Sequence, residues 1–185
     1  MNFIHKSNII MYRIAIIGPE STGKSILAEQ LAKHYHSPWV PEYARTYIES
    51  LSRSYDFDDI KHIALKQIEQ EVKFETDQGN PFVFFDTDLI ITKVWFEYCY
   101  NEVPIFVEER LNTRFFDLYL LCEPDIPWVA DSVREHGHDR EHFFNWYRSE
   151  IIKLNKPYVI IRGMGENRVN CAVRNINEFL IQPSI

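Results

Sequence analysis

One stretch of eight residues has the types and the spacing needed to bind phosphate. Residues 18–25 read Gly-Pro-Glu-Ser-Thr-Gly-Lys-Ser and match G-x-x-x-x-G-K-[ST] at every fixed position. In such a loop the backbone N–H groups point inward at a phosphate, and the N-terminus of the next helix adds partial positive charge. We expect Lys24 to reach the β- and γ-phosphates of ATP, and the Ser25 hydroxyl to ligate Mg²⁺. The residues predicted to bind the nucleotide here are Gly18, Glu20, Ser21, Thr22, Gly23, Lys24, Ser25 and Ile26.

The sequence on either side of this loop supplies the context that a phosphate site requires. Residues 12–17 form an apolar run typical of a short buried strand, and residues 26–32 have a helical pattern. A strand, the loop and then a helix is the arrangement that separates a working phosphate loop from a chance match.

A second candidate site follows another apolar run. Residues 82–88 read Phe-Val-Phe-Phe-Asp-Thr-Asp, so a buried strand ends in two acids. Asp86 is suited to hold Mg²⁺ beside a phosphate loop, directly or through water. Asp88, two residues further on, is predicted to face an acceptor molecule. It is equally suited to be the N-cap of the helix that begins at Leu89, and it could serve both purposes.

Residues 41–45, Pro-Glu-Tyr-Ala-Arg, place an acid, an aromatic ring and an arginine within one helical turn. Glu42 is a candidate to orient an acceptor hydroxyl or to take its proton. Tyr43 and Arg45 could recognise a sugar or a base. The alternative for Glu42 is a first-turn acid that only stabilises a helix N-terminus. The sequence leaves open whether Glu42 or Asp88 orients the acceptor.

The polar segment 123–140 carries Arg134 and Arg140 between prolines near its start and Gly137 near its end. A long polar connection in a compact domain is usually functional or disordered, and arginines on a closing loop can stabilise a transferring phosphoryl group. We therefore predict a lid, the alternative being a solvated surface. Trp128 within it is predicted to stack on a flat ligand.

Two further predictions concern the chain around this segment. Residues 163–165, Gly-Met-Gly, follow the last predicted strand, and Gly163 is expected to lie against adenine, with a simple turn as the alternative. Trp95 and Tyr98 lie at helical spacing among apolar residues and are predicted to be core.

Strand and helix patterns alternate along the chain. Strands are predicted at 12–17, 82–86, 117–122 and 157–162, with a short extended piece at 37–41, and helices at 26–32, 42–53, 57–78, 88–100, 104–114, 141–154 and 166–180. This alternation predicts an α/β fold of three layers, with a central parallel sheet flanked by helices. Ligands of such sheets bind beyond the carboxyl ends of the strands. We expect one domain over 11–185, preceded by a flexible extension at 1–10.

Composition narrows the classes of partner. The 185 residues carry a net charge of −7, which argues against broad binding to nucleic acid or to an anionic membrane surface. No apolar run approaches a membrane span, and the first ten residues lack the apolar core of a signal peptide. Three scattered cysteines suggest free thiols in a reducing, cytoplasmic compartment.

Taken together, the motifs resemble the ribosylnicotinamide kinase domain of NadR-type proteins. The resemblance rests on the loop 18–25, on Glu-Tyr-Ala-Arg at 42–45, on Asp-Thr-Asp at 86–88 with Thr92, and on Trp-Val-Ala-Asp-Ser-Val-Arg at 128–134. It implies a P-loop kinase fold and phosphorylation of the ribose 5′-hydroxyl of nicotinamide riboside by ATP and Mg²⁺, giving nicotinamide mononucleotide. Asp131, in the last motif, joins the candidate substrate-binding residues.

Two other functional classes stay open at this point. The chain could phosphorylate another nucleoside or small metabolite, since only the acceptor pocket would differ. It could also be a nucleotide-dependent switch or ATPase. We expect a nucleoside-type small molecule as partner, and the sequence does not set the oligomeric state.

Overall fold

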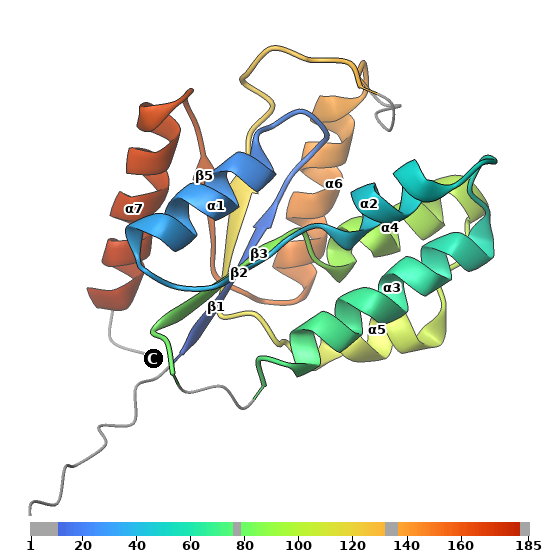
Figure 1. Ribbon diagram of the computed structural model, residues 1–185, viewed down its shortest axis with the longest axis horizontal. Coiled ribbons are helices and arrows are strands. Elements are labelled where there is room, and N and C mark those ends of the chain that lie inside the picture. The colour runs from blue at the N-terminus through green and yellow to red at the C-terminus, as the bar shows by residue number, and fades with distance from the viewer. Residues whose placement is uncertain (1–10, 76–78, 132–136, 182–185) are drawn as a thin grey trace, which may run out of the picture.

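The computed structural model describes residues 11–75, 79–131 and 137–181 (Figure 1). The predicted N-terminal extension at 1–10 and Arg134 lie outside these residues. The strands are β1 (Tyr12–Ile17), β2 (Trp39–Val40), β3 (Phe82–Asp86), β4 (Leu118–Cys122) and β5 (Tyr158–Ile161). The helices are α1 (Lys24–His34), α2 (Tyr43–Ser50), α3 (Phe57–Val72), α4 (Leu89–Tyr100), α5 (Ile105–Asn112), α6 (Arg140–Lys153) and α7 (Glu166–Ile181).

The strands form one parallel sheet in the order β2-β3-β1-β4-β5. In its register Ile16 lies beside Asp86 on one side and beside Leu120 on the other. Because all the strands run in the same direction, their carboxyl ends share one edge. The phosphate loop, Glu42, Asp86, the segment after β4 and the loop at Gly163 all begin at that edge.

Helices cover both faces of the sheet, as an all-parallel sheet requires (Figure 1). The odd residues of β1, Ala15 and Ile17, belong to a core shared with α4 and α6. The even residues, Ile14 and Ile16, belong to a second core shared with α1 and α7. This alternation along one strand confirms the predicted three-layer α/β fold.

A third, smaller core lies among the helices themselves. Ile60 and Ala64 of α3, Leu89 and Phe96 of α4 and Val107 of α5 are buried together. In Figure 1, α2, α3 and α5 extend from the α4 side of the sheet as a group. We call α2, α3, α4 and α5 the helical lobe, and α4 joins it to the sheet.

Most predicted elements are found within a few residues of their expected limits. The exception is the helix predicted at 57–78, which ends at Val72. The ring of Phe74 contacts Phe85 of β3 edge to face, with centroids 5.7 Å apart, so the chain leaves the helix to pack on the sheet. In the described parts of the chain, none of the helices is long and apolar enough to span a membrane.

Candidate active site

The phosphate loop is fixed by contacts among its own residues and with β4. Gly18 has φ of +150°, and a Cβ atom there would lie 2.7 Å from the carbonyl oxygen of Cys122, so only glycine fits. The buried Thr22 hydroxyl donates to the Pro19 carbonyl at 2.8 Å. Gly23 is the left-handed N-cap of α1. Lys24 Nζ donates to the Pro19 carbonyl at 3.0 Å, so the ammonium already lies over the loop.

Asp86 lies at the end of β3 beside this loop, with only 3% of its surface exposed. Burial raises the pKa of Asp86, while Lys24, a hydrogen bond from the Ser25 hydroxyl and one from the Glu42 backbone N–H oppose the rise. Among the described residues, no hydrogen bond reaches Asp86 Oδ1, although the atom is buried. A buried carboxylate oxygen with an open position, next to a hydroxyl, fits the all-oxygen ligation that Mg²⁺ takes.

Glu42 follows β2 and is the N-cap residue of α2. Its side chain makes no capping hydrogen bond. The alternative, an acid that stabilises the N-terminus of α2 through its charge, stays a prediction. Burial raises the pKa of Glu42, Lys24 and Arg45 act in the opposite direction, and Asp86 and Glu20 add to the rise. The carboxylate therefore lies within electrostatic reach of both Lys24 and Asp86.

Asp88 is the N-cap of α4, with Oδ1 accepting from the Ile90 backbone N–H at 3.0 Å. It is 2% exposed, and burial together with the nearby Glu71 raises its pKa to about 8. The carboxyl group faces Glu71 and Tyr119 inside the protein. Asp88 thus is the N-cap of α4, one of the two roles predicted for it from the sequence. It lies outside the cavity described next.

A cavity of about 490 Å³ opens beside the phosphate loop. The loop residues 18–26 form one end of it, and Glu42 and Lys24 lie in the same lining. The remaining lining comes from residues widely separated in the sequence, namely Ala44, Arg45, Ile48, Tyr55, Ile91, Trp95, Tyr98, Asp131, Phe143 and Tyr147. We call this second end the acceptor compartment. It has the right position for a molecule that receives a group from a phosphate held by the loop.

Comparison with known proteins places this site in a family. The AAA domain family matches residues 13–168, which is most of the chain. The chain belongs to the AAA domain family. A curated relative, the Trifunctional NAD biosynthesis/regulator protein NadR of Salmonella typhimurium, is 33% identical over 155 residues, which are 80% of this chain and 38% of the relative. The chain thus spans well under half the length of the curated relatives that it matches.

Two solved structures agree with this relationship. The crystal structure of NadR protein in complex with NR has a TM-score of 0.70 and 26% identity, covering 91% of this chain and 51% of the other. The crystal structure of NadR protein in complex with NAD and AMP-PNP has a TM-score of 0.67 at 26% identity, covering 91% and 49%. These findings confirm the predicted resemblance: this AAA-family chain is a P-loop kinase domain of the NadR type.

The acceptor compartment of this NadR-type domain contains aromatic residues that the sequence did not indicate. The rings are Tyr55, Trp95, Tyr98, Phe143 and Tyr147, from the loop before α3 and from helices α4 and α6. The prediction that Tyr98 is core is wrong, because Tyr98 is 45% exposed and lines the cavity. Trp95 packs against the core of the helical lobe as predicted, and it lines the cavity as well. One feature of the sequence could have indicated these rings. Helix α4 begins directly after Asp86 and Asp88, so it starts at the edge of the sheet where ligands bind.

Tyr43 and Arg45, both predicted to recognise a sugar or a base, lie in different places in the structure. Arg45 lines the cavity, and its Nη2 pairs with Asp131 Oδ2 at 2.7 Å while Nη1 pairs with Glu49 at 3.1 Å. Asp131 lines the cavity as well, so this ion pair closes one side of the compartment. Tyr43 instead contacts His62 of α3, with its hydroxyl 2.9 Å from Nε2, and lies outside the lining.

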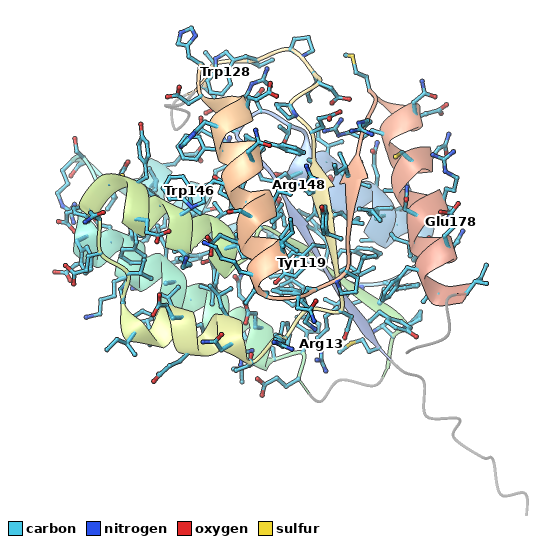
Figure 2. All side chains as sticks on the ribbon, turned by 180° about the vertical axis from the view of Figure 1, so that it is seen from behind. Arg13, Tyr119, Trp128, Trp146, Arg148 and Glu178 are labelled. Atoms are coloured by element: carbon cyan, nitrogen blue, oxygen red, sulfur yellow. The ribbon has the colours of Figure 1, made fainter. Side chains whose placement is uncertain are left out.

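The described part of the predicted lid lies against the phosphate loop. Arg140 Nη1 donates to the Ile126 carbonyl at 2.9 Å and to the Ser21 carbonyl at 3.4 Å. Trp128 lies near the N-terminal end of α6, as Figure 2 shows, with the Arg140 guanidinium 6.0 Å from its ring centre. Its ring packs on Gly137, where a Cβ atom would lie 2.8 Å from it. Trp128 therefore packs within its own segment and is outside the cavity lining.

The loop at Gly163 is held by the segment after β4. Gly163 N–H donates to Asp125 Oδ2 at 2.6 Å, and Arg168 bridges Asp125 Oδ1 and the Gly163 carbonyl at 2.7 and 2.6 Å. Gly163 has φ of +92°, which favours glycine. This loop is outside the cavity lining, so its contact with adenine stays a prediction.

Proposed function

We propose that this domain is a kinase that uses ATP and Mg²⁺ to phosphorylate the ribose 5′-hydroxyl of nicotinamide riboside, giving nicotinamide mononucleotide. One observation carries the proposal. The phosphate loop and an aromatic-walled compartment open into the same cavity, and Glu42 lines it with its carboxylate in reach of Lys24 and Asp86. A donor phosphate and an acceptor hydroxyl could therefore meet beside a carboxylate.

In this proposal the donor end binds and orients the nucleotide. The loop N–H groups and Lys24 hold the β- and γ-phosphates, and Ser25 and Asp86 hold Mg²⁺, which neutralises phosphate charge when it is bound. Arg140, anchored beside the loop, and Arg134 belong to a lid that covers the transferring group. The likeness to the NadR structure with NAD and AMP-PNP supports an ATP-type donor.

Glu42 is our choice over Asp88 for orienting the acceptor hydroxyl and accepting its proton. Glu42 lines the cavity, whereas Asp88 is buried outside it and uses one oxygen to cap α4. The pKa of Glu42 is raised by burial, and a carboxylate with a raised pKa is a stronger base at neutral pH. Lys24 and Arg45 keep the ionised form accessible.

The acceptor compartment favours a nucleoside over a nucleotide. Its aromatic rings offer stacking surfaces for a planar base. Within the described part of the chain, its basic side chains are Lys24, assigned to the donor, and Arg45, already paired with two acids. Among these described lining residues, a phosphate on the acceptor would therefore find no basic partner beyond these two. The NadR structure with NR supports nicotinamide riboside as that nucleoside.

The test is the release of ADP from Mg·ATP by the purified protein, with and without nicotinamide riboside and a panel of common nucleosides. Strong stimulation by nicotinamide riboside, with nicotinamide mononucleotide as product, is expected. Stimulation only by another nucleoside would replace the acceptor and keep the phosphoryl transfer. ADP release that no acceptor stimulates would overturn the proposal in favour of an ATPase or switch.

A further inference from the structure

An arginine begins the buried face of α7. The buried residues of this helix are Arg168, Ala172 and Ile176, whose spacing puts them on one face. Ala172 and Ile176 belong to the core that α7 shares with α1 and the sheet. Arg168 is only 5% exposed, at a position where an apolar residue would continue that face. Replacing a buried ion pair by apolar residues of similar size often leaves stability unchanged or raises it. Stability alone therefore does not account for an arginine here.

Arg168 fills the fork where the chain segments that follow β4 and β5 separate (Figure 1). Just beyond the paired residues of these strands, Glu123 N–H donates to the Ile161 carbonyl at 3.0 Å. Past that point Arg168 Nη2 donates to the Glu123 carbonyl at 2.8 Å, and Nη1 donates to the Gly163 carbonyl at 2.6 Å. Nη1 also pairs with Asp125 Oδ1 at 2.7 Å. One side chain of α7 thus holds both segments.

Asp125 is the partner of Arg168 on the segment after β4. Its Oδ1 pairs with Arg168, and its Oδ2 accepts from Gly163 N–H at 2.6 Å. Burial acts to raise the pKa of Asp125, but the Gly163 N–H and the Arg168 guanidinium outweigh this effect and lower the pKa. The carboxylate is therefore ionised at neutral pH, and both of its oxygens are used to join the two segments.

The residues that follow Asp125 lie directly on the phosphate loop. Ile126 Cδ1 is 3.6 Å from the position that a Cβ atom on Gly23 would take. Val129 N–H donates to Ser21 Oγ at 3.0 Å. These contacts come from the same short stretch of chain whose first residue is held by the fork. A shift of Asp125 would therefore be transmitted to the phosphate loop.

We propose that Arg168 is a positioning residue for the donor nucleotide. By holding Asp125 at the fork, it sets where Ile126 and Val129 rest on the phosphate loop, and so how well the N–H groups of the loop fit the donor phosphates. Arg168 is outside the cavity lining, so it acts through these residues and not by touching the nucleotide there. The inference rests on the donor half of the proposed function and does not depend on which acceptor reacts.

The test measures Kd for AMP-PNP with Mg²⁺ by calorimetry on the full chain, well below the thermal midpoint of each variant. Arg168→Gln removes the charge and the forked geometry, and it is expected to raise Kd about tenfold. Arg168→Lys should limit the rise to about threefold, because an ammonium can pair with Asp125 but does not reproduce the planar fork. Initial rates with Mg·ATP should show a higher KM for ATP and an acceptor KM within about twofold of wild type.

Asp125→Asn tests the same link from the other side, and it carries the test if Arg168→Gln does not fold. It is expected to raise Kd for AMP-PNP about as much as Arg168→Gln does. Because both changes break one contact, the double variant should show little more than the effect of either single variant.

Two control variants separate positioning from stability. Arg162→Gln removes the exposed ion pair with Glu123 next to the fork and should leave Kd unchanged. Arg110→Gln breaks a buried ion pair with Glu71 in the helical lobe, so it should lower the thermal midpoint and leave Kd unchanged. A wild-type Kd in the folded Arg168→Gln and Asp125→Asn variants, or an equal rise in Arg110→Gln, overturns the inference.

Failure of the proposed function would give a different result, because the binding of AMP-PNP needs no acceptor. A raised Kd in Arg168→Gln, with no phosphorylation of nicotinamide riboside by wild-type protein, would overturn the proposed acceptor and support the positioning role. Phosphorylation by wild-type protein, with an unchanged Kd in Arg168→Gln, would do the reverse.

Discussion

The two ends of the cavity are built in different ways. The donor end consists of one continuous segment, and much of its geometry comes from the backbone: glycines at 18 and 23, and the contacts of Thr22 and Lys24 with the Pro19 carbonyl. The acceptor compartment is assembled from side chains of α2, α4, α6 and the connecting segments. The first is a local structure, and the second exists only after the helical lobe and α6 pack on the sheet.

This difference predicts which property of the reaction each end of the cavity controls. A backbone cradle recognises any phosphate chain, so its residues set whether transfer occurs. Side-chain walls recognise the shape and charge of one molecule, so their residues set which acceptor reacts. Substitutions at the donor end should therefore act on kcat, and substitutions in the compartment walls on the KM of the acceptor.

The largest effect is expected at Lys24. Lys24→Ala removes the ammonium that would balance charge on the transferring phosphoryl group, and we expect kcat/KM to fall by roughly 10³. The thermal midpoint should stay within about 3 °C of wild type, since the lysine is not part of the core. Lys33→Ala, an exposed lysine at the other end of α1, should keep full activity. Full turnover by Lys24→Ala would show that the phosphate loop does not act in phosphoryl transfer.

The next effect distinguishes Glu42 from Asp88. Glu42→Gln keeps the side-chain size but removes the base, so kcat should fall by roughly 10² while the acceptor KM changes little. Asp88→Asn keeps a good N-cap residue for α4 and should change kcat less than about threefold. The measurement is the initial rate of each variant as a function of acceptor concentration, at saturating ATP. A large loss in Asp88→Asn together with a small one in Glu42→Gln would reverse our assignment.

A smaller and more selective effect is expected in the aromatic walls. Trp95→Leu removes a stacking surface and should raise the acceptor KM about tenfold, with the KM for ATP nearly unchanged. Trp146→Leu is the matched control, because Trp146 of α6 packs on the core outside the lining (Figure 2). Equal rises in both KM values of Trp95→Leu would contradict the division between the two ends.

The last prediction concerns stability rather than rate, and it is expected to leave the rate nearly unchanged. The folded-state pKa of Asp88 is raised to about 8, and that of its neighbour Glu71 to about 7 despite its ion pair with Arg110, in both cases mainly by burial. The folded protein thus keeps protons that the unfolded chain releases near pH 4, so the free energy of unfolding should fall as pH rises from about 4 to about 8.

Asp88→Asn has no such proton to lose, so it should reduce the pH 5 to pH 8 difference in the free energy of unfolding by about 3.5 kcal/mol, as follows from a pKa of about 8 in the folded protein and about 3.9 in the unfolded chain. Urea unfolding at both pH values measures it. An identical pH dependence in the variant and the wild type would show that Asp88 is ionised in the folded protein.

The sequence predicted the donor end well because its determinants are local. Residues 18–25 specify their own loop, and the apolar runs on either side specify the strand and helix. Glu42 and Asp86 were found because strand ends share one edge of a parallel sheet. The acceptor compartment was mostly missed, since Tyr55, Phe143 and Tyr147 meet only through tertiary packing. Tyr98 was misassigned, and the cavity-lining position of Trp95 was missed, because a helical apolar pattern does not distinguish a core from the wall of a cavity.

The backbone N–H of Glu42 lies close enough to the Asp86 carboxylate to lower its pKa, and β2, which Glu42 follows, pairs with β3, which ends at Asp86. A displacement of the end of one strand should therefore also move the end of the other. Occupation of the donor end should accordingly fix the position of Glu42 before an acceptor arrives. Expressed in binding terms, the two substrates should show synergy, each increasing the affinity for the other by the same factor.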